Sequence, residues 1–510
     1  MTTHRPSSRP SFSDHARTAT DRGPASDLAI GVDVGTSGVG VVALDRAGRV
    51  VATADHPVPL ATPQPGWTEQ DPSDWVAATQ AGLASVAKQV GADRVVALGL
   101  SGQMHGMVAT DANGRVLRPA LLWNDQRTAA EAAEIDAAVG RHRLIARTGN
   151  PAITGFQLPK VLWLRRHEPQ VFARTTRVAL PKDHVATVLT GDATAEPTDA
   201  SGTGAYELRT GTWDTEVLAA VDLDPSLWPR LVRSHEVVGP LRAAVAEHVG
   251  LRAGLPVVAG AGDNAAASTA LALGARHREV GSVSLGTSGV LFAALEEPTP
   301  EPEGRVHLFA HADGGFNLLG VTLSAAGSLR WYRDVFAPNA SYDELMAAAA
   351  DSPPGANGVT FKPYLAGERS PHLRPDLRGS FHGLSLATSR ADVVRAVIEG
   401  VAFSLRETYD VMSKIAAPSR WLATGGGAKS DLWLTVIATL LGAPVGRPAG
   451  PDGFETSAGA AEGAAWLAWR ALGHDPDRQP RAGAWLEPDE RSAPALEDAY
   501  QRYLALGPRG

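Results

Sequence analysis

The sequence predicts an α/β protein of two large domains with a ligand-binding cleft between them. The chain has 510 residues, which is more than one compact core usually holds. The pentapeptide GTSGV occurs at 35–39 and again at 286–290, each time inside an apolar, β-branched stretch. Several apolar segments also end abruptly in glycine and polar residues, as strands do at the ligand-binding edge of an α/β sheet. Together these observations indicate a duplicated domain whose two copies face each other.

Composition limits the classes of function. The net charge is -8, the isoelectric point is about 6.0 and 44% of the residues are hydrophobic, with no basic stripe of the kind that binds nucleic acid. The absence of cysteine excludes disulfides, thiolate metal sites and a cysteine nucleophile. No uninterrupted apolar run reaches membrane-spanning length, and no secretory signal is evident. We therefore expect a soluble, cytoplasmic protein with small-molecule partners, no nucleic acid and no membrane.

The predicted domain order begins with a disordered tail at 1–27, which is rich in Ser, Thr, Arg and Pro. A first domain at 28–275 follows, and a second domain spans 276–505. The first domain opens with LAIGVDVGTSGVGVVALD, which is typical of a two-stranded hairpin. A segment at 66–75, GWTEQDPSDW, leads into a helix expected to start near Asp74.

The first hairpin carries a candidate metal and phosphate site. Asp33 stands at the end of its first strand, where a carboxylate could hold a hydrated Mg²⁺. Gly35 permits a tight turn, and the amides and hydroxyls of Thr36 and Ser37 could donate to phosphate oxygens. An ordinary hairpin turn explains this stretch equally well when it is taken alone.

The second hairpin, GSVSLGTSGVLFAAL at 281–295, repeats the first with one change. Ser284 occupies the place of Asp33, so the two turns cannot do the same work. We assign metal binding to the first turn and phosphate binding to Gly286 and Thr287 in the second.

A third candidate region follows the predicted strand at 95–100. The sequence SGQMHGM places Met104 and His105 at a strand end beside glycine, where ligand contacts are common, although a loop histidine without a partner is an equal alternative. Other polar residues end strands in the same way, and chemistry alone does not choose among them: Asn124, Asp125, Lys182 and Asp183.

The stretch VVAGAGDNAAA at 257–267 is the centre of the predicted site. An apolar strand stops at glycines and presents Asp263 and Asn264 at the start of a small-residue helix. The simplest interpretation makes Asp263 the N-cap of that helix. Because this carboxylate lies in sequence between two phosphate-type loops, we favour a general base for phosphoryl transfer.

These motifs and others in order resemble the FGGY family of carbohydrate kinases, most closely its xylulokinase branch, from about residue 28 to 463. The supporting stretches are DVGTSG, GWTEQDPSDW, SGQMHG, LWNDQRT, PKDH, AGAGDNAA, SLGTSG, LAGERSPH, GSFHGLSLATSRADVVRAVIEG and TGGGAKSDLW. The resemblance implies two actin-like, ribonuclease H-like domains, with ATP and a sugar in the cleft between them. It also implies ATP-dependent phosphorylation of D-xylulose at its 5-hydroxyl.

The resemblance assigns a role to each candidate residue. Asp263 would be the general base, and Met104, His105 and Asn264 would hold the ketose. Asp33 would act on the phosphates through Mg²⁺ and its water, and Thr36, Ser37, Gly286 and Thr287 would bind the phosphates. The nucleotide wall would be formed by Gly425, Gly426, Gly427 and Lys429, with Ser430.

Departures from the family pattern leave alternatives open. Gln157 replaces a small residue or proline near the expected sugar side, and Lys429 stands where many relatives have arginine. Glu368 and Arg369 could line the substrate or form an internal ion pair, which we favour. Met104 and His105 replace the Arg-Glu pair of glycerol kinases, which argues against glycerol.

The substrate and the oligomeric state are the other open questions. Another ketose, a pentitol or a sugar acid remains an alternative substrate, and a non-sugar ATPase or scaffold is an alternative function. The alanine-rich helix at 458–472 could be a core element or the face of a homodimer.

Overall fold

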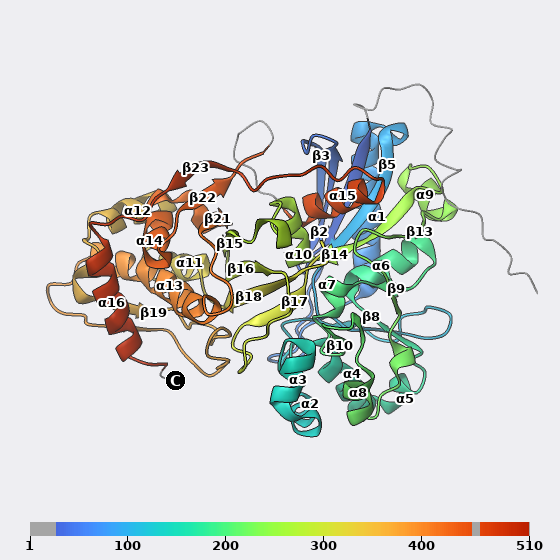
Figure 1. Ribbon diagram of the computed structural model, residues 1–510, viewed down its shortest axis with the longest axis horizontal. Coiled ribbons are helices and arrows are strands. Elements are labelled where there is room, and N and C mark those ends of the chain that lie inside the picture. The colour runs from blue at the N-terminus through green and yellow to red at the C-terminus, as the bar shows by residue number, and fades with distance from the viewer. Residues whose placement is uncertain (1–26, 451–458, 509–510) are drawn as a thin grey trace, which may run out of the picture.

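The computed structural model describes residues 27–450 and 459–508, so the predicted tail at 1–27 lies, except for residue 27, outside the described residues. Two large mixed sheets form the centres of two α/β domains, as predicted (Figure 1). No helix in the described ranges is long and apolar enough to cross a membrane. The predicted boundary near residue 275 falls between the last strand of one sheet and the first strand of the other.

The first sheet has six strands. Its order is β13 (Val237–Pro240), β14 (Pro256–Gly262), β5 (Val95–Gly102), β1 (Leu28–Val34), β2 (Gly38–Asp45) and β3 (Val50–Pro57). The predicted hairpin is confirmed as the antiparallel pair β1–β2, and β5 and β14 run parallel to β1. The parallel strands therefore bring Asp33, the 103–105 segment and Asp263 to one edge of the sheet.

The second sheet repeats this plan with seven strands. Its order is β17 (His307–Ala310), β18 (Phe316–Thr322), β16 (Gly289–Leu295), β15 (Val280–Leu285), β21 (Arg420–Thr424), β22 (Val445–Pro448) and β23 (Ala482–Leu486). The β15–β16 hairpin is antiparallel, and β21 and β22 run parallel to β15, as β5 and β14 do to β1. The predicted duplication is confirmed at the level of strand order.

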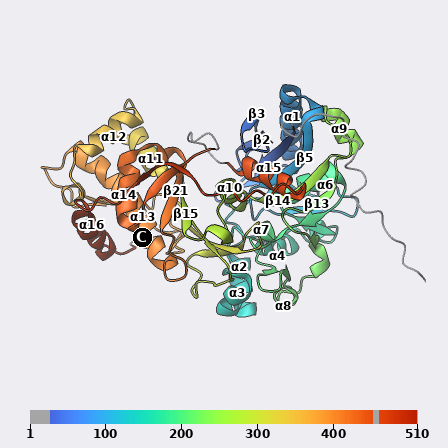
Figure 2. The ribbon, with the colours of Figure 1, turned by 45° about the horizontal axis from the view of Figure 1, so that its top comes forward.

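Helices cover both faces of the first sheet (Figures 1 and 2). One face packs against α1 (Pro72–Val90), α6 (Pro181–Thr190) and α9 (Ala243–Val249). The other packs against α10 (Asp263–Ala270) and α15 (Ala460–Ala471). Helix α1 begins slightly before the expected position near Asp74, because Asp71 is its N-cap and Pro72 occupies its first turn.

A smaller lobe extends the first domain, and most of it is inserted between β5 and β13, with the short strand β4 (Glu69–Gln70) contributed from before β5. Its helices are α2 (Ala129–Ile135), α3 (Arg141–Thr148), α4 (Gln157–His167), α5 (Pro169–Phe172), α7 (Pro197–Ala200) and α8 (Thr215–Ala220), with a π-helical turn at Asp136–Gly140. Its short strand pairs are β4 (Glu69–Gln70) with β7 (Ala120–Leu121), β6 (Val108–Thr110) with β8 (Arg177–Ala179), β9 (Thr194–Ala195) with β12 (Arg230–Leu231), and β10 (Tyr206–Glu207) with β11 (Thr212–Trp213). An apolar cluster that includes Leu162 and Trp163 holds this lobe together.

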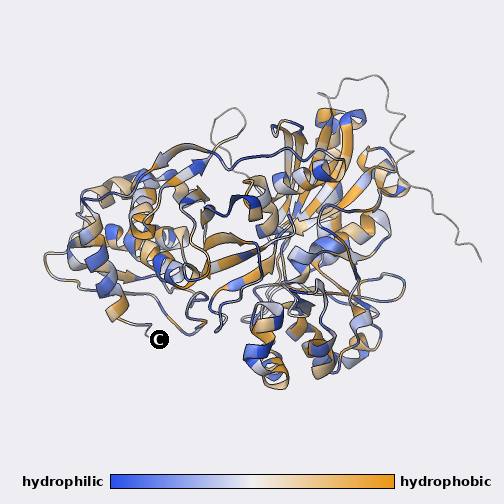
Figure 3. Ribbon diagram, viewed as in Figure 1, coloured by the Kyte–Doolittle hydropathy of each residue, from blue (hydrophilic) through white to orange (hydrophobic). Residues whose placement is uncertain are grey.

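The second domain packs its long helix α13 (Arg390–Met412) against β16 and β18. The remaining helices are α11 (Ala326–Phe336), α12 (Tyr342–Ala350), α14 (Asp431–Leu441) and α16 (Ala493–Ala505), and β19 (Thr360–Lys362) pairs with β20 (Ser380–His382). Short 3₁₀ turns lie at Ala92–Arg94, Pro225–Leu227, Ala275–His277, Ala356–Gly358 and Gly426–Lys429. Hydrophobic residues concentrate along the strands of both sheets (Figure 3).

The two domains share packing. Helix α15, which comes late in the sequence, returns to the first sheet, and its Ala461 carbonyl lies so close to Gly31 that no Cβ would fit there. The described part of the 458–472 segment is therefore a core helix, with Trp469 fully buried. An apolar cluster also joins Met104 and Phe156 of the first domain to Phe292 and Phe309 of the second.

Candidate active site

The carboxyl end of β14 presents Asp263 on a constrained backbone. Gly260 has a φ of 78° and lies against the Leu100 backbone with no space for a side chain, so only glycine fits there. Gly262, whose N–H donates to the Thr198 hydroxyl at 2.9 Å, takes the N-cap position of α10. The interpretation of Asp263 as that N-cap is therefore wrong, because the helix already begins at Asp263.

The Asp263 carboxylate is held by its neighbour and stays partly exposed. It accepts from the Asn264 backbone N–H at 2.7 Å and from the Asn264 side-chain amide at 2.9 Å. Desolvation, followed by repulsion from Asp33, raises its pKa to about 7. A carboxylate with a pKa near neutrality is suited to general-base chemistry.

Asp33 lies near Asp263 at the end of β1. One of its carboxylate oxygens, Oδ1, is buried and has no hydrogen-bond partner among the residues that the structure describes. Burial raises its pKa from 3.8 to about 6. Two desolvated carboxylates that repel each other create a place where a cation would be stabilised.

A buried ionic cluster lies behind Asp263. The Lys182 ammonium is within 2.6 Å of Asp183, 3.4 Å of Glu196 and 3.5 Å of Asp199. Burial and the neighbouring carboxylates raise the pKa of Asp199, and Asp263 contributes to that shift. This cluster therefore places several buried carboxyl groups next to Asp263.

Met104 and His105 follow the end of β5, next to Asp263. The Met104 side chain fills the space that a side chain on Gly262 would need, at 2.7 Å from that Cβ position. His105 has a φ of 70°, and its Nδ1 lies 2.7 Å from the Gly202 carbonyl oxygen. Because a carbonyl only accepts, Nδ1 donates, and Nε2 keeps its lone pair. Burial lowers the His105 pKa to about 3, so the ring is neutral.

Two residues of α4, Lys160 and Gln157, hold the backbone carbonyls of His105 and Gly106 in place. The fully buried Lys160 donates from Nζ to the carbonyl oxygens of His105 at 2.8 Å and Gly155 at 2.5 Å. The Gln157 amide donates to the Gly106 and Ala179 carbonyls and accepts from the Trp228 indole. The Gln157 side chain is thus engaged entirely by the protein.

The first hairpin turn is tied into a polar network. The Thr36 hydroxyl donates to Gln103 at 3.0 Å and accepts from the Trp123 indole at 3.0 Å. Gln70 donates to the Thr36 carbonyl at 2.7 Å and accepts from Gln103 at 2.9 Å. The Thr36 hydroxyl is therefore occupied, whereas Ser37 is exposed at the tip of the turn.

The second hairpin turn borders an open cavity of about 560 Å³. Gly425 has a φ of 86° and lies against the backbone of Leu285 and Gly286, so the two glycine loops touch. The cavity is lined by Leu285, Gly286, Thr287, Ala326, Gly327, Leu329, Arg330, Tyr342, Asp343, Met346, Gly426, Gly427, Lys429, Ser430 and Trp433. Most of the predicted nucleotide residues thus come together around one space.

Several polar residues have structural contacts instead. Asp125 accepts from the Thr68 backbone N–H and from the Arg127 guanidinium, and Asn124 accepts from the Thr68 hydroxyl. The Glu368 carboxylate accepts from the Arg369 backbone N–H at 2.8 Å. Within the described ranges no ion pair joins the Glu368 and Arg369 side chains, so the favoured ion-pair interpretation is wrong.

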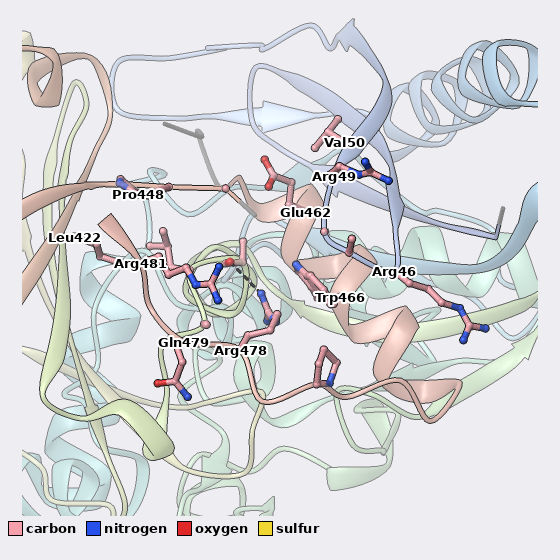
Figure 4. A pocket seen from close by; sticks show the side chains of 18 of the residues that line it. Arg46, Arg49, Val50, Leu422, Pro448, Glu462, Trp466, Arg478, Gln479 and Arg481 are labelled. Atoms are coloured by element: carbon pink, nitrogen blue, oxygen red, sulfur yellow. Dashed lines mark hydrogen bonds between the residues drawn. The ribbon is translucent and has the colours of Figure 1, made fainter. Parts of the chain in front are cut away.

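Another cavity, of about 630 Å³, lies behind α10 and contains none of the predicted site residues (Figure 4). Arg478 lines it and donates to the Ala270 and Thr269 carbonyls, at the end of α10 opposite Asp263. Its guanidinium also stacks on Trp466, with 4.0 Å to the ring centroid. These contacts fix the helix that carries Asp263.

Sequence reasoning missed several residues of the site. Lys160 lies within QLPKVLWL, a run whose every residue is buried, and a lysine in such an apolar run was the available signal. Gly202 and Phe156, which enclose the His105 ring, carried no local signal because their contacts with it are long-range. The second-domain residues Arg330 and Trp433 line the cavity from helices whose periodic pattern indicated only packing.

Comparison with known proteins agrees with this architecture. Residues 28–270 match the N-terminal domain and residues 281–472 the C-terminal domain of the FGGY family of carbohydrate kinases. The chain is 39% identical to the xylulose kinase of Escherichia coli (strain K12) over 482 residues, which are 94% of this chain and 96% of that protein.

Solved structures give the same result. A crystal structure of a "xyloylose kinase" from Brucella ovis has a TM-score of 0.87 at 39% identity, covering 94% of this chain and 99% of that one. A gluconate kinase from Lactobacillus acidophilus has a TM-score of 0.88 at 25% identity, covering 94% and 97%. From its matched domains, its relatives and its fold, the chain belongs to the FGGY family of carbohydrate kinases.

Proposed function

We propose that this protein transfers the γ-phosphoryl group of ATP to the 5-hydroxyl of D-xylulose, giving D-xylulose 5-phosphate and ADP. The observation that carries the proposal is the partly exposed Asp263 carboxylate, whose pKa is about 7 and which lies at the same sheet edge as Met104 and His105. The names of the Escherichia coli and Brucella ovis relatives support xylulose as the sugar.

In the proposed reaction, Asp263 accepts the proton of the 5-hydroxyl as the new bond from O5 to the γ-phosphorus forms. The bond between that phosphorus and the β,γ-bridging oxygen breaks, and ADP leaves with the electron pair. Asn264 fixes the carboxylate through its two hydrogen bonds. The neutral His105 offers Nε2 as an acceptor for another hydroxyl of the sugar.

Asp33 is the residue proposed to act on Mg²⁺, through bound water. The unpartnered, buried Oδ1 of Asp33 and the repulsion between Asp33 and Asp263 fit the binding of a cation near Asp33. The described residues hold no group of three or more carboxylate, histidine or cysteine side chains that would form a protein-only metal cage. This donor set suits Mg²⁺, which keeps several waters and is shared with substrate phosphates. When bound, the ion would neutralise charge on the phosphates.

The second domain is proposed to bind the nucleotide. Gly286 and Thr287 would contact phosphates, together with the exposed turn of the first hairpin at Thr36 and Ser37. The wall of Gly425, Gly426, Gly427 and Lys429 would accept the flat adenine, since a base can lie close only where no Cβ intrudes. The N-terminus of α11 also borders this cavity, but its Gly327 and Ser328 N–H groups already donate to the Thr287 and Ala325 carbonyls.

A sugar acid is the second candidate substrate, because the gluconate kinase of Lactobacillus acidophilus shares the fold. Family membership speaks against the scaffold alternative. We further propose a cytoplasmic location, where ATP and Mg²⁺ are available. A homodimer stays a prediction, and the burial of α15 removes the helix that suggested it.

Purified protein with Mg-ATP should release ADP in the presence of D-xylulose. The test panel adds L-xylulose, D-ribulose, L-ribulose, xylitol, D-arabinitol, glycerol and gluconate, with a control lacking sugar. Phosphorus NMR of the product should place the phosphate on C5. A preference for gluconate would replace the proposed substrate, and sugar-independent hydrolysis would contradict the proposed function.

A further inference from the structure

We propose that Arg369 binds the sugar: its guanidinium, supplied by the second domain, donates hydrogen bonds to oxygen atoms at the end of the ketose remote from Asp263. This inference rests on the proposed function and deepens it. It adds a specificity-determining residue to a sugar site whose other members all come from the first domain.

The Arg369 guanidinium has no hydrogen-bond or ion-pair partner among the described residues. Among the described residues, the only hydrogen bond that Arg369 donates to a side chain comes from its backbone N–H, which reaches Glu368. Arg369 is partly exposed, and partial desolvation lowers the pKa of its guanidinium to about 10. An arginine carries five N–H donors, and a desolvated cation without partners is costly. A bound ligand would supply the missing acceptors.

The loop does not need this side chain for its shape. The Glu368 carboxylate accepts from the Leu323 N–H at 2.8 Å, the Arg369 N–H at 2.8 Å and the Ser404 hydroxyl at 3.2 Å. The Ser370 N–H donates to the Val321 carbonyl at 2.8 Å. Backbone contacts therefore anchor the loop, and the guanidinium is left free to act elsewhere.

Arg369 extends from the second domain toward the first. Its Nη2 lies 3.5 Å from the Cβ position of Gly155, so the side chain crosses from the second domain to the first. Its positive charge lowers the pKa values of His105, Lys160 and His307. The guanidinium is thus close to the His105 side of the predicted sugar site.

The surroundings offer unfilled hydrogen-bond positions. His105 keeps an Nε2 lone pair because its Nδ1 donates to Gly202. His307 shares a hydrogen bond with Asn150 through Nδ1, and its Nε2 is buried without a partner. Stacked rings, including the Phe156 ring at 4.7 Å from that of His105, form an apolar wall beside them. Convergent donors and acceptors beside an apolar wall are typical of a site for a small polar ligand.

The order of the strands that carry Asp263 and His105 suggests how the sugar would lie between them. Asp263 follows β14 and His105 follows the adjacent parallel strand β5. A ketose with its 5-hydroxyl at Asp263 and its chain directed toward His105 brings its carbonyl end to Arg369. A carbonyl oxygen only accepts hydrogen bonds, which matches a guanidinium that only donates. Because Arg369 belongs to the second domain, sugar binding would also favour the closed arrangement of the two domains.

The test uses the full-length variants Arg369→Gln and Arg369→Lys, with Arg374→Gln as the matched control. Arg374 is an exposed arginine of the same loop whose guanidinium pairs with Asp376. We expect the KM for D-xylulose to rise roughly 10- to 100-fold in Arg369→Gln, the range expected for losing a charged hydrogen bond. The kcat and the KM for ATP should change far less, Lys should restore part of the loss, and the control should match wild type.

Two further readouts separate sugar binding from a structural role. Without ligand, the melting temperature of Arg369→Gln should equal or exceed that of wild type, because a partly desolvated cation without a protein partner has been removed. D-xylulose should raise the melting temperature of wild type and of Arg374→Gln but much less that of Arg369→Gln, while Mg-ADP raises all three. An unchanged KM for D-xylulose in folded Arg369→Gln would overturn the inference. Absence of any sugar-dependent turnover by wild type would instead refute the proposed function.

Discussion

The two GTSG hairpins have the same strand order around them but different chemical surroundings. In the first, Asp33 ends β1 with a buried, orphaned oxygen, and the Thr36 hydroxyl is already bonded within the domain. In the second, Ser284 takes the place of Asp33, Thr287 is exposed, and the turn opens on a cavity lined by glycines. The two turns have equivalent places in the strand order, and the difference between Asp33 and Ser284 is the basis for the different roles that we propose for them.

This difference also determines where charge is placed. The first domain concentrates carboxylates near the reacting centre, with Asp33, Asp199 and Asp263 all raised in pKa by burial. The second domain offers a cavity whose lining includes several glycines and only three charged residues, Arg330, Asp343 and the exposed Lys429. On our account the first hairpin acts through charge and metal, and the second through shape and backbone amides.

The largest effect on activity is expected from a change in the first domain, at Asp263. Asp263→Asn removes the base while keeping the size of the side chain, so sugar-dependent kcat should fall roughly 10²- to 10⁴-fold. The KM for ATP should hardly change, because the proposed nucleotide cavity lies beside the other hairpin. A coupled assay of ADP release measures both, and Asp498→Asn on the surface of α16 is the control. Near-normal turnover by Asp263→Asn would refute the base assignment.

A smaller effect is expected at the first hairpin. Asp33→Asn should raise the Mg²⁺ concentration needed for half-maximal activity roughly 10- to 100-fold, as loss of an outer-shell partner typically does. Excess EDTA should abolish turnover in wild type. Titration of Mg²⁺ at fixed ATP tests this, with exposed Asp55→Asn on the neighbouring strand as control. Equal Mg²⁺ requirements in both variants would contradict the role of Asp33.

The raised pKa of Asp263 also predicts a pH dependence. The base must be ionised, so kcat/KM should fall about tenfold per pH unit below pH ~7. Both Asp33 and Asp263 bind protons more tightly in the folded state, at about 6 and about 7 against 3.8 unfolded, so stability should decline as pH rises from about 4 to about 7.

Two measurements test the predicted pH dependence of kcat/KM and of stability. The pH–rate curve of wild type should bend near pH 7, and the stability of the double variant Asp33→Asn/Asp263→Asn should decline less steeply with pH than that of wild type, with the remaining decline coming from other buried carboxyls such as Asp183 and Asp199. A pH–rate profile that is flat from pH 5 to 8 would show that Asp263 is not the base.

The smallest effect is expected at the second hairpin. A Cβ at Gly425 would lie 2.8 Å from the Leu285 carbonyl group, at a φ of 86°. Gly425→Ala should therefore displace the glycine loop and weaken nucleotide binding roughly tenfold. Gly250→Ala is the matched control, because Gly250 has a positive φ of 69° with open space around it. Equal nucleotide affinity in both variants would contradict the proposal that the loop at Gly425 binds the nucleotide.

Strand positions and their ends could be predicted from sequence because they depend on local signals. The hairpins at β1–β2 and β15–β16, the strand β5 and the strand–helix junction at Asp263 all follow from apolar runs that stop at glycine. Helix α1 was placed slightly late because Asp71 and Asp74 both resemble helix-start residues, and only the capping hydrogen bond to Ser73 distinguishes them.

Long-range contacts could not be predicted in the same way. The His105 tautomer depends on Gly202, 97 residues away, and the His105 backbone is held by the buried Lys160. The state of Arg369 depends on which atoms meet across two domains, whereas its neighbour Glu368 suggested a local ion pair. Sequence patterns identify residues at strand ends, but they do not report which of those residues remain without partners after packing.

We propose that the first hairpin acts on the metal and the second binds the nucleotide. The most direct test is calorimetric titration of ADP, without Mg²⁺, into wild type, Asp33→Asn and Gly425→Ala. Our account predicts that Asp33→Asn binds ADP as wild type does or more tightly, since a repelling carboxylate is lost. Gly425→Ala should bind roughly tenfold more weakly. Weaker binding by Asp33→Asn together with unchanged binding by Gly425→Ala would contradict it.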